Sequence, residues 1–202
     1  MIIEAIFPTP LAITKSEFSL TEEQKDFLIN QKRCENTGNT SSEDTYILKH
    51  DVVSNLRDWL QSQVNEYVER IEKPKNDVEL YITQSWVNWT QPGQFHHKHS
   101  HLNSLISGVF YIDVSSETDK IHFFKMAMKQ LDFGPRKEYN EFNCEEYFYP
   151  IESNMLVLFP SSLQHHVEKT INNTETRISL AFNTFARGIL GTDDTMTGLH
   201  LS

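Results

Sequence analysis

Apolar positions in the first third of the chain recur at helical spacing. Over residues 51–72 they return every three or four positions, which predicts one buried face of a long amphipathic helix. A shorter helix is predicted from residue 21 to about residue 32, because Thr21 and Gln24 have the spacing of a capping box. The polar residues 34–43 are predicted to form a loop.

After residue 74 the pattern changes to short runs that are rich in β-branched and aromatic residues. Polar, turn-prone segments separate these runs, as expected for strands. Helices followed by many short strands are typical of helices packed against an antiparallel sheet or barrel. The predicted strands are residues 78–90, 104–114, 121–125, 155–159 and 177–185.

The length of 202 residues suits a single domain. We expect a helical N-terminal part over about residues 1–75, a barrel over about 76–187 and a C-terminal tail over 188–202. Residues 129–149 form a long, aromatic and acidic insertion with little periodicity. Such a segment fits a lid over a pocket or an irregular surface loop equally well.

Composition narrows the class of protein. The formal net charge of −10 argues against general nucleic-acid binding, because an acidic surface repels phosphates. Two cysteines form neither a disulfide framework nor a thiolate metal site, and they fit a reducing cytoplasm. No stretch reaches the roughly 18 apolar residues of a membrane span, and the N-terminus lacks the features of a signal peptide. We therefore expect a cytoplasmic protein, whose oligomeric state the sequence does not indicate.

Histidines carry most of the chemical information. Side chains two positions apart in a strand share a face, so His97, His99 and His101 are all able to pair on one metal, and spacing alone does not choose between them. The third ligand has to come from a distant strand. Neutral imidazole suits iron, zinc, copper and nickel alike, and a surface cluster without metal is the alternative. The clustered histidines are His96, His97, His99, His101, His165 and His166.

A second candidate group opens the last predicted strand. Arg177 and Ser179 lie two positions apart, and Arg177 follows His165 by twelve residues. A guanidinium group binds a carboxylate through two parallel hydrogen bonds, and a nearby hydroxyl adds a third. An arginine among inward-facing apolar residues needs a buried anion. That anion is either a structural Asp or Glu or the carboxylate of a ligand.

These motifs together resemble a known family. Residues 93–111, which contain the histidine cluster and Ser107-Gly108, resemble the core motif of 2-oxoglutarate/iron(II) oxygenases of a group found in marine bacteria and cyanophages. Residues 159–167 and 177–183 resemble the second motif of that group, and residues 6–11 resemble its N-terminus. The resemblance spans nearly the whole chain.

The resemblance implies a mainly β fold with N-terminal helices, a double-stranded β-helix of the jelly-roll or cupin-like type. It also implies an iron(II) ion held by a His-X-(Asp/Glu/His) pair and a distal histidine. Alignment on Ser107-Gly108 places the pair at His99 and His101, and the second motif selects His165 over His166.

The same resemblance assigns the far carboxylate of 2-oxoglutarate to Arg177, with Ser179 as its helper. It implies a 2-oxoglutarate/iron(II)-dependent dioxygenase of the hydroxylase type, which uses 2-oxoglutarate, O₂ and an unidentified substrate. The expected location is the cytoplasm of a bacterium or of a phage-infected cell.

One departure from the usual pattern leaves alternatives open. The facial triad of such enzymes commonly has two histidines and one carboxylate. Here His101 occupies the middle position, and the nearest acid downstream, Asp113, lies outside the motif. A three-histidine site also resembles cupin-type iron dioxygenases that need no 2-oxoglutarate. The alternatives are a cupin-like metal-dependent dioxygenase or isomerase, or a non-enzymatic metal-binding module on the same barrel.

Overall fold

A computed structural model describes residues 1–15, 18–126, 131, 133–169 and 175–202. Short 3-10 turns at Ile47–Lys49, Asp51–Val53 and Asp193–Thr195 accompany the helices and strands. The elements are, in chain order, β1 Ala12–Lys15, α1 Glu22–Ile29, β2 Arg33–Glu35, β3 Thr40–Ser42, α2 Ser54–Ile71, β4 Val78–Thr90, β5 His96–His99, β6 Ile106–Asp113, β7 Lys120–Phe124, β8 Glu146–Pro150, β9 Met155–Pro160, β10 His165–Val167, β11 Arg177–Leu190 and β12 Leu199–Leu201.

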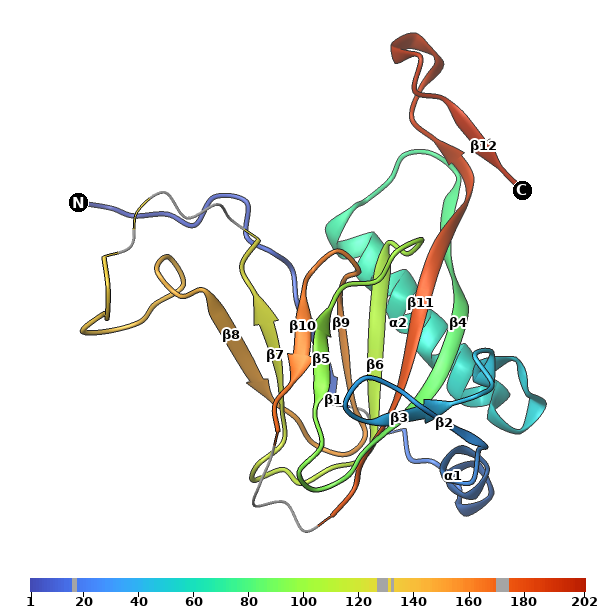
Figure 1. Ribbon diagram of the computed structural model, residues 1–202. Helices are drawn as coiled ribbons and strands as arrows, with labels where there is room; N and C mark the ends of the chain where they lie inside the picture. The colour runs from blue at the N-terminus through green and yellow to red at the C-terminus, as the bar shows by residue number, and fades with distance from the viewer. Residues whose placement is uncertain (16–17, 127–130, 132, 170–174) are drawn as a thin grey trace.

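The strands form two antiparallel sheets. The larger sheet has the order β1-β9-β6-β11-β4-β3-β2, with β12 added to the end of β11, and the smaller has the order β5-β10-β7-β8 (Figure 1). The helix α2 lies along the larger sheet, on the side away from the smaller one (Figure 1). The expected fold, a mainly β protein with N-terminal helices and a double-stranded β-helix, is confirmed.

Alternation along β6 divides the interior into two apolar clusters. Phe110 and Ile112 belong to the cluster that packs against α2. Val109 and Tyr111, one position out of phase, belong to the cluster between the two sheets. Successive side chains of a strand point to opposite faces, so this one strand contributes to both clusters.

The predicted helices are present with the expected buried faces. In α2 the buried residues Leu56, Leu60 and Val64 recur at the predicted spacing of three or four. In α1 the Thr21 side chain accepts a hydrogen bond from the Gln24 backbone, and the Gln24 side chain accepts one from the Thr21 backbone. This is the predicted capping box.

The prediction of a loop over residues 34–43 was wrong. This segment contains most of a hairpin in which β2 pairs with β3, and β3 pairs with β4 at the edge of the larger sheet. Gly38, at a φ of +92°, lies in the turn. These strands are short and polar, so hydrogen bonds to neighbouring strands define them and no hydrophobic alternation marks them.

The long strands were predicted closely. Residues 78–90 match β4 at both ends, and the other four predicted strands correspond to β6, β7, β9 and β11 within a few residues. The strand β11 continues to Leu190, and β12 pairs back onto it, so part of the predicted C-terminal tail forms a hairpin. The strands β1, β5, β8, β10 and β12 were not predicted.

The predicted insertion contributes to the smaller sheet. Residues 129, 130 and 132 lie outside the described residues. The end of the insertion forms β8, which pairs with β7. Residues 141–147 line a cavity of about 650 Å³ together with the N-terminal residues 4–9.

Two expectations from composition concern membranes and thiols. Across the part of the chain that the structure describes, no helix is both long enough and apolar enough to cross a membrane. Cys34 is exposed, Cys144 is partly buried, and both are free. The absence of a disulfide framework fits the cysteine count.

Gly108 provides a test of packing in the larger sheet. A methyl group added there would lie 2.2 Å from the ring of Phe182, its partner in β11, which is fully buried and has no room to withdraw. We expect Gly108→Ala to lower the free energy of unfolding by about 1–3 kcal/mol, as other overpacking changes do. Urea denaturation measures this, and Leu102→Ala, at an exposed position, should change stability by less than about 0.5 kcal/mol.

Candidate metal centre

Three of the predicted ligands meet at one point between two neighbouring strands. His165 begins β10 and is directly opposite His99, at the end of β5. His101 lies two residues further on, where its backbone N–H donates to the Ser161 carbonyl at 2.9 Å. The ring centroid of His165 lies 4.3 Å from that of His99 and 5.1 Å from that of His101. One ring nitrogen from each of the three lies within 4.8 Å of the others.

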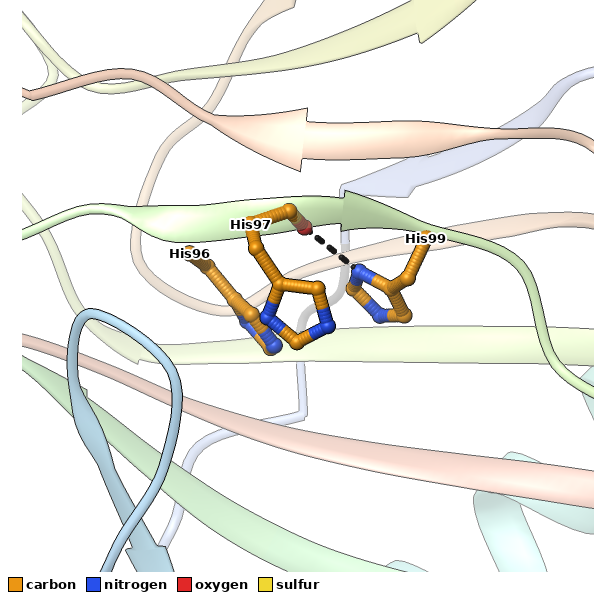
Figure 2. A group of neighbouring side chains, drawn as sticks. All are labelled: His96, His97 and His99. Atoms are coloured by element: carbon orange, nitrogen blue, oxygen red, sulfur yellow. Dashed lines mark hydrogen bonds between the residues drawn. The ribbon is translucent and has the colours of Figure 1, made fainter.

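Backbone carbonyls orient two of these rings. The Nδ1 atom of His99 lies 2.7 Å from the carbonyl oxygen of His97 (Figure 2), and Nδ1 of His165 lies 3.0 Å from that of Leu163. A carbonyl only accepts, so each Nδ1 carries the proton and each Nε2 keeps its lone pair. A hydrogen bond that fixes the tautomer in this way is typical of metal-ligating histidines.

The third ring is oriented by side chains from the larger sheet. Nδ1 of His101 lies 2.7 Å from Asn183 Oδ1 and 2.7 Å from Ser107 Oγ. The Ser107 hydroxyl in turn donates to Asn183 Oδ1 at 2.9 Å. Asn183 on β11 and Ser107 on β6 are cross-strand partners and both are buried. His101 therefore also presents Nε2, and sequence reasoning did not identify the two residues that orient it.

Burial keeps these histidines neutral. Loss of solvent lowers the pKa of His101 to about 4, with a further contribution from the neighbouring His99. Burial also lowers the pKa of His99, and it lowers that of His165 well below the usual value, with the nearby His99 and His101 adding to the effect. The neutral form is the one that binds a metal.

The donor set fits a divalent transition metal. Three neutral imidazoles with free Nε2 atoms suit iron(II), and they suit zinc, copper or nickel as well. Among the described residues, no Asp or Glu joins these three histidines in the group. The departure from the two-histidine, one-carboxylate triad is therefore present in the structure as well as in the sequence.

A bulge in β5 brings a further histidine to the cluster. His165 is opposite His99 while Val167 is opposite His96, so β5 holds one more residue than β10 over this interval. The His96 ring stacks on that of His99, with centroids 4.5 Å apart and 22° between the planes. Simple alternation predicted only His97, His99 and His101 on one face, and it missed His96. His96, His97 and His99 form a second, overlapping group of potential ligands.

Arg177 is buried near this cluster. It is 4% exposed, its Nη1 donates to the Lys120 carbonyl at 2.8 Å, and its guanidinium carbon lies 5.1 Å from the centre of the Tyr111 ring. Burial lowers the pKa of His96 to about 3, and the charge of Arg177 contributes to this shift. Among the described residues no carboxylate lies within ion-pair distance of Arg177. The buried Asp119 lies close enough for its charge to act on Tyr111 together with that of Arg177, so both sources considered for the anion, a structural Asp and a ligand carboxylate, stay open.

Two polar groups accompany Arg177. Ser179 is buried on β11, directly opposite Tyr111 of β6. The hydroxyl of Tyr111 is buried and has no hydrogen-bond partner, and burial raises the pKa of Tyr111 to about 12. A buried arginine that forms no ion pair among the described residues, and a buried hydroxyl that forms no hydrogen bond there, together fit an anionic ligand. Tyr111 was not identified from the sequence, where it reads as one more strand aromatic.

The fold and this cluster define a double-stranded β-helix protein with a buried histidine centre. Residues 84–183 match the profile of the family described as "Putative 2OG-Fe(II) oxygenase". The whole of the smaller sheet, the three histidines of the centre and Arg177 fall inside this segment. No curated protein matches the chain.

Solved structures share the fold at low sequence identity. A 2OG-Fe(II) oxygenase family oxidoreductase from Burkholderia pseudomallei has 7% identity and a TM-score of 0.60, covering 86% of this chain and 83% of that one. A Pseudomonas putida prolyl-4-hydroxylase has 12% identity and a TM-score of 0.56, covering 89% and 94%. HygX from Streptomyces hygroscopicus, solved with nickel, 2-oxoglutarate and hygromycin B, has 12% identity and a TM-score of 0.58, covering 87% and 82%.

The lowered pKa values generate a prediction about stability and pH. A histidine whose folded pKa lies below its unfolded value stabilises the fold fully above about pH 6.5, and the stabilisation is lost as the pH falls towards the folded pKa. For His101 this window runs from about pH 6.5 to about pH 4. In metal-free protein, the free energy of unfolding should therefore depend less steeply on pH in His101→Gln than in wild type. The difference in slope should be up to about 1.4 kcal/mol per pH unit. Urea denaturation between pH 7 and 4.5 measures the slope, with His200→Gln on the exposed C-terminal hairpin as control. Equal slopes for wild type and His101→Gln would contradict the prediction.

Proposed function

We propose that the protein is a non-haem iron(II), 2-oxoglutarate-dependent oxygenase of the hydroxylase type, acting on an unidentified substrate. The proposed iron ligands are His99, His101 and His165. One observation carries the proposal: three imidazoles with fixed Nδ1–H groups converge beside a buried Arg177 that forms no ion pair among the described residues. The family match of residues 84–183 supports the same conclusion.

When bound, iron(II) and 2-oxoglutarate would supply the oxygen-activating chemistry, and the protein would position the reactants. The three Nε2 atoms would hold the metal and leave open positions for the cosubstrate and O₂. Asn183 and Ser107 would keep His101 in its ligating tautomer. At the other end, the Arg177 guanidinium would bind the far carboxylate of 2-oxoglutarate, with hydrogen bonds from Ser179 and the unpartnered Tyr111 hydroxyl.

The finer assignments belong to the same proposal. Structures with this fold are described as a prolyl hydroxylase, an epimerase and a carbocyclase, so hydroxylation is one of several outcomes that such a site supports. We propose membership of the marine bacterial and cyanophage group, a single domain over residues 1–202, and action in the cytoplasm. Release of succinate in the presence of amino acids, peptides, nucleosides or lipids would identify the substrate class.

The three-histidine donor set favours one alternative. A cupin-like metal-dependent dioxygenase that works without 2-oxoglutarate would need the same ligands but no carboxylate receptor. The two functions differ in how the anaerobic iron(II) protein responds to 2-oxoglutarate. An oxygenase develops a metal-to-ligand charge-transfer band as the 2-oxo acid chelates iron, whereas the alternative enzyme leaves the spectrum unchanged.

The ligand assignment predicts which histidines the iron requires. His99→Ala and His165→Ala should each lose one equivalent of bound iron(II) while keeping the fold, because each removes one of three protein donors. His101→Asp should retain iron, because a carboxylate oxygen is an adequate ligand. Iron content after anaerobic gel filtration, with circular dichroism as the check of folding, provides the measurement.

His97→Ala is the matched control, since His97 belongs to the same cluster but not to the proposed triad. It should keep its iron. If His97→Ala emptied the site and His101→Ala did not, the ligands would lie two residues earlier in the chain than we propose.

The role proposed for Arg177 predicts how its variants bind 2-oxoglutarate. Arg177→Ala should leave iron content intact and weaken 2-oxoglutarate binding by about two orders of magnitude or more, because losing one partner of a buried charge pair costs about 2–5 kcal/mol. Arg177→Lys should restore binding only in part, since lysine keeps the positive charge but does not form the bidentate hydrogen bonds of a guanidinium group. Ser179→Ala should cost about 1–2 kcal/mol. Titration of the charge-transfer band measures all three.

Arg187→Ala is the control for this series. Arg187 lies on the same strand, but it is exposed and bonded to Glu79. It should titrate like wild type. Should Arg177→Ala also titrate like wild type, or should wild type show no band at millimolar 2-oxoglutarate, the cupin-like alternative becomes the better assignment.

A further inference from the structure

A separate, third group of potential ligands lies on the opposite face of the smaller sheet. His165 and His166 are consecutive in β10, so their side chains point to opposite faces. His165 packs against Phe159 inside the barrel, with ring centroids 4.7 Å apart. His166 points away from the interior, where it is the direct cross-strand partner of His122 on β7.

Two glutamates share that outer face. Phe148 of β8 is directly opposite His122, and Glu146 lies two residues before it, on the same side of the strand. Glu168 lies just past the end of β10, two residues beyond His166, and its carboxylate lies near His122. Three neighbouring strands thus bring two imidazoles and two carboxylates together, although the four residues are scattered along the sequence.

The four side chains of this group lie in close contact. Glu146 Oε1 lies 2.6 Å from His122 Nδ1 and 3.4 Å from His166 Nε2. Glu168 Oε2 lies 3.6 Å from His122 Nε2. One ligand atom from each of the four residues lies within 4.8 Å of the others. Ligands bound to zinc at about 2.0–2.1 Å in a tetrahedron lie roughly 3.3 Å apart, close to the Glu146–His166 separation. The shorter Glu146–His122 contact is a hydrogen bond that metal binding would replace, and His122 would offer the ion only one of its two ring nitrogens.

One atom of the group is unsatisfied. The Nε2 atom of His166 is buried, and Glu146 Oε1 lies 3.4 Å away, close enough for an ion pair but without good hydrogen-bond geometry. The His122 side chain is itself only 6% exposed. A buried ring nitrogen without a partner is costly, and a metal ion accepting its lone pair would remove that cost.

We propose that His122, Glu146, His166 and Glu168 form a second metal site, which binds a divalent transition metal of the zinc class. Two imidazoles and two carboxylates form a donor set typical of zinc, whereas magnesium and calcium favour all-oxygen shells. The two carboxylate charges balance the two charges of the ion. The rings of Phe124, 5.0 Å from His166, and Phe148, 5.7 Å from His122, flank the two imidazoles, whereas the two glutamates are exposed.

The site has a structural role in this arrangement. A metal held there ties together β7, β8 and β10, which are otherwise joined by short ladders. It fixes the end of the insertion that leads into β8. It also braces β10 at the residue next to His165. The site itself does not depend on the chemistry proposed for the inner centre.

Metal stoichiometry of the full-length protein tests the proposal. Chelator-treated protein is dialysed against zinc(II), and bound zinc is measured by elemental analysis. Wild type should bind two equivalents, and His99→Ala and His122→Ala one equivalent each. The double variant His99→Ala/His122→Ala should bind none. Glu146→Gln and Glu168→Gln, which keep side-chain size, should each weaken the second site at least tenfold.

His50→Ala is the matched control. His50 also lies 2.7 Å from a carboxylate, that of Asp44, but the two belong to none of the potential metal-binding groups among the described residues. It should leave the stoichiometry at two. Zinc should also raise the melting temperature of His99→Ala but not that of the double variant, since only a site that binds the folded state stabilises it.

The two proposals fail in different ways. If His99→Ala binds no zinc, or if His122→Ala binds as much as wild type, the second site is refuted. If wild type binds one equivalent that His122→Ala loses and His99→Ala keeps, the outer site stands and the inner one falls. An unchanged affinity in both Glu→Gln variants would also refute the proposed ligand set.

Discussion

Alternation along β11 is the constraint on which both the core and the candidate centre depend. Its even-numbered residues Ile178, Leu180 and Phe182 pack into the cluster beneath the helices. The odd-numbered residues include Arg177, Ser179 and Asn183, which face the smaller sheet. Because β11 pairs with β4 on one side and β6 on the other, its orientation is fixed along most of its length. The apolar half of the strand thus holds the polar half in place, and a shift of one residue would exchange the two.

The sequence predicted the features that leave a mark on local pattern. The amphipathic stripe of α2, the capping box of α1 and the bounds of β4 all follow from spacing within one segment. The resemblance to a known family also nominated His99, His101 and His165, and the structure brings these three together. Their roles as iron ligands, and those of Arg177 and Ser179, remain predictions that the variants described above will test.

What the sequence did not reveal depends on register between distant strands. Asn183 and Tyr111 are unremarkable in their own strands, and they matter because pairing of β6 with β11 places them beside His101 and Ser179. His122 likewise looks isolated until β7 pairs with β10. The short polar strands escaped prediction for a related reason, because hydrogen bonds across the sheet define them more than burial of their own side chains.

The bulge in β5 has a consequence for how this protein tolerates changes in chain length. Because β5 has one residue more than β10 between its two paired positions, the count of residues from His96 to His99 decides which imidazoles face His165. Removing a single residue there would restore regular pleating. The histidines of β5 before the deletion would then point to the opposite face of the sheet. Point substitutions in this stretch alter one side chain at a time, whereas a one-residue deletion reassigns several at once. In an alignment with divergent relatives, the position of a gap in this strand therefore decides which histidines of the two sequences are matched.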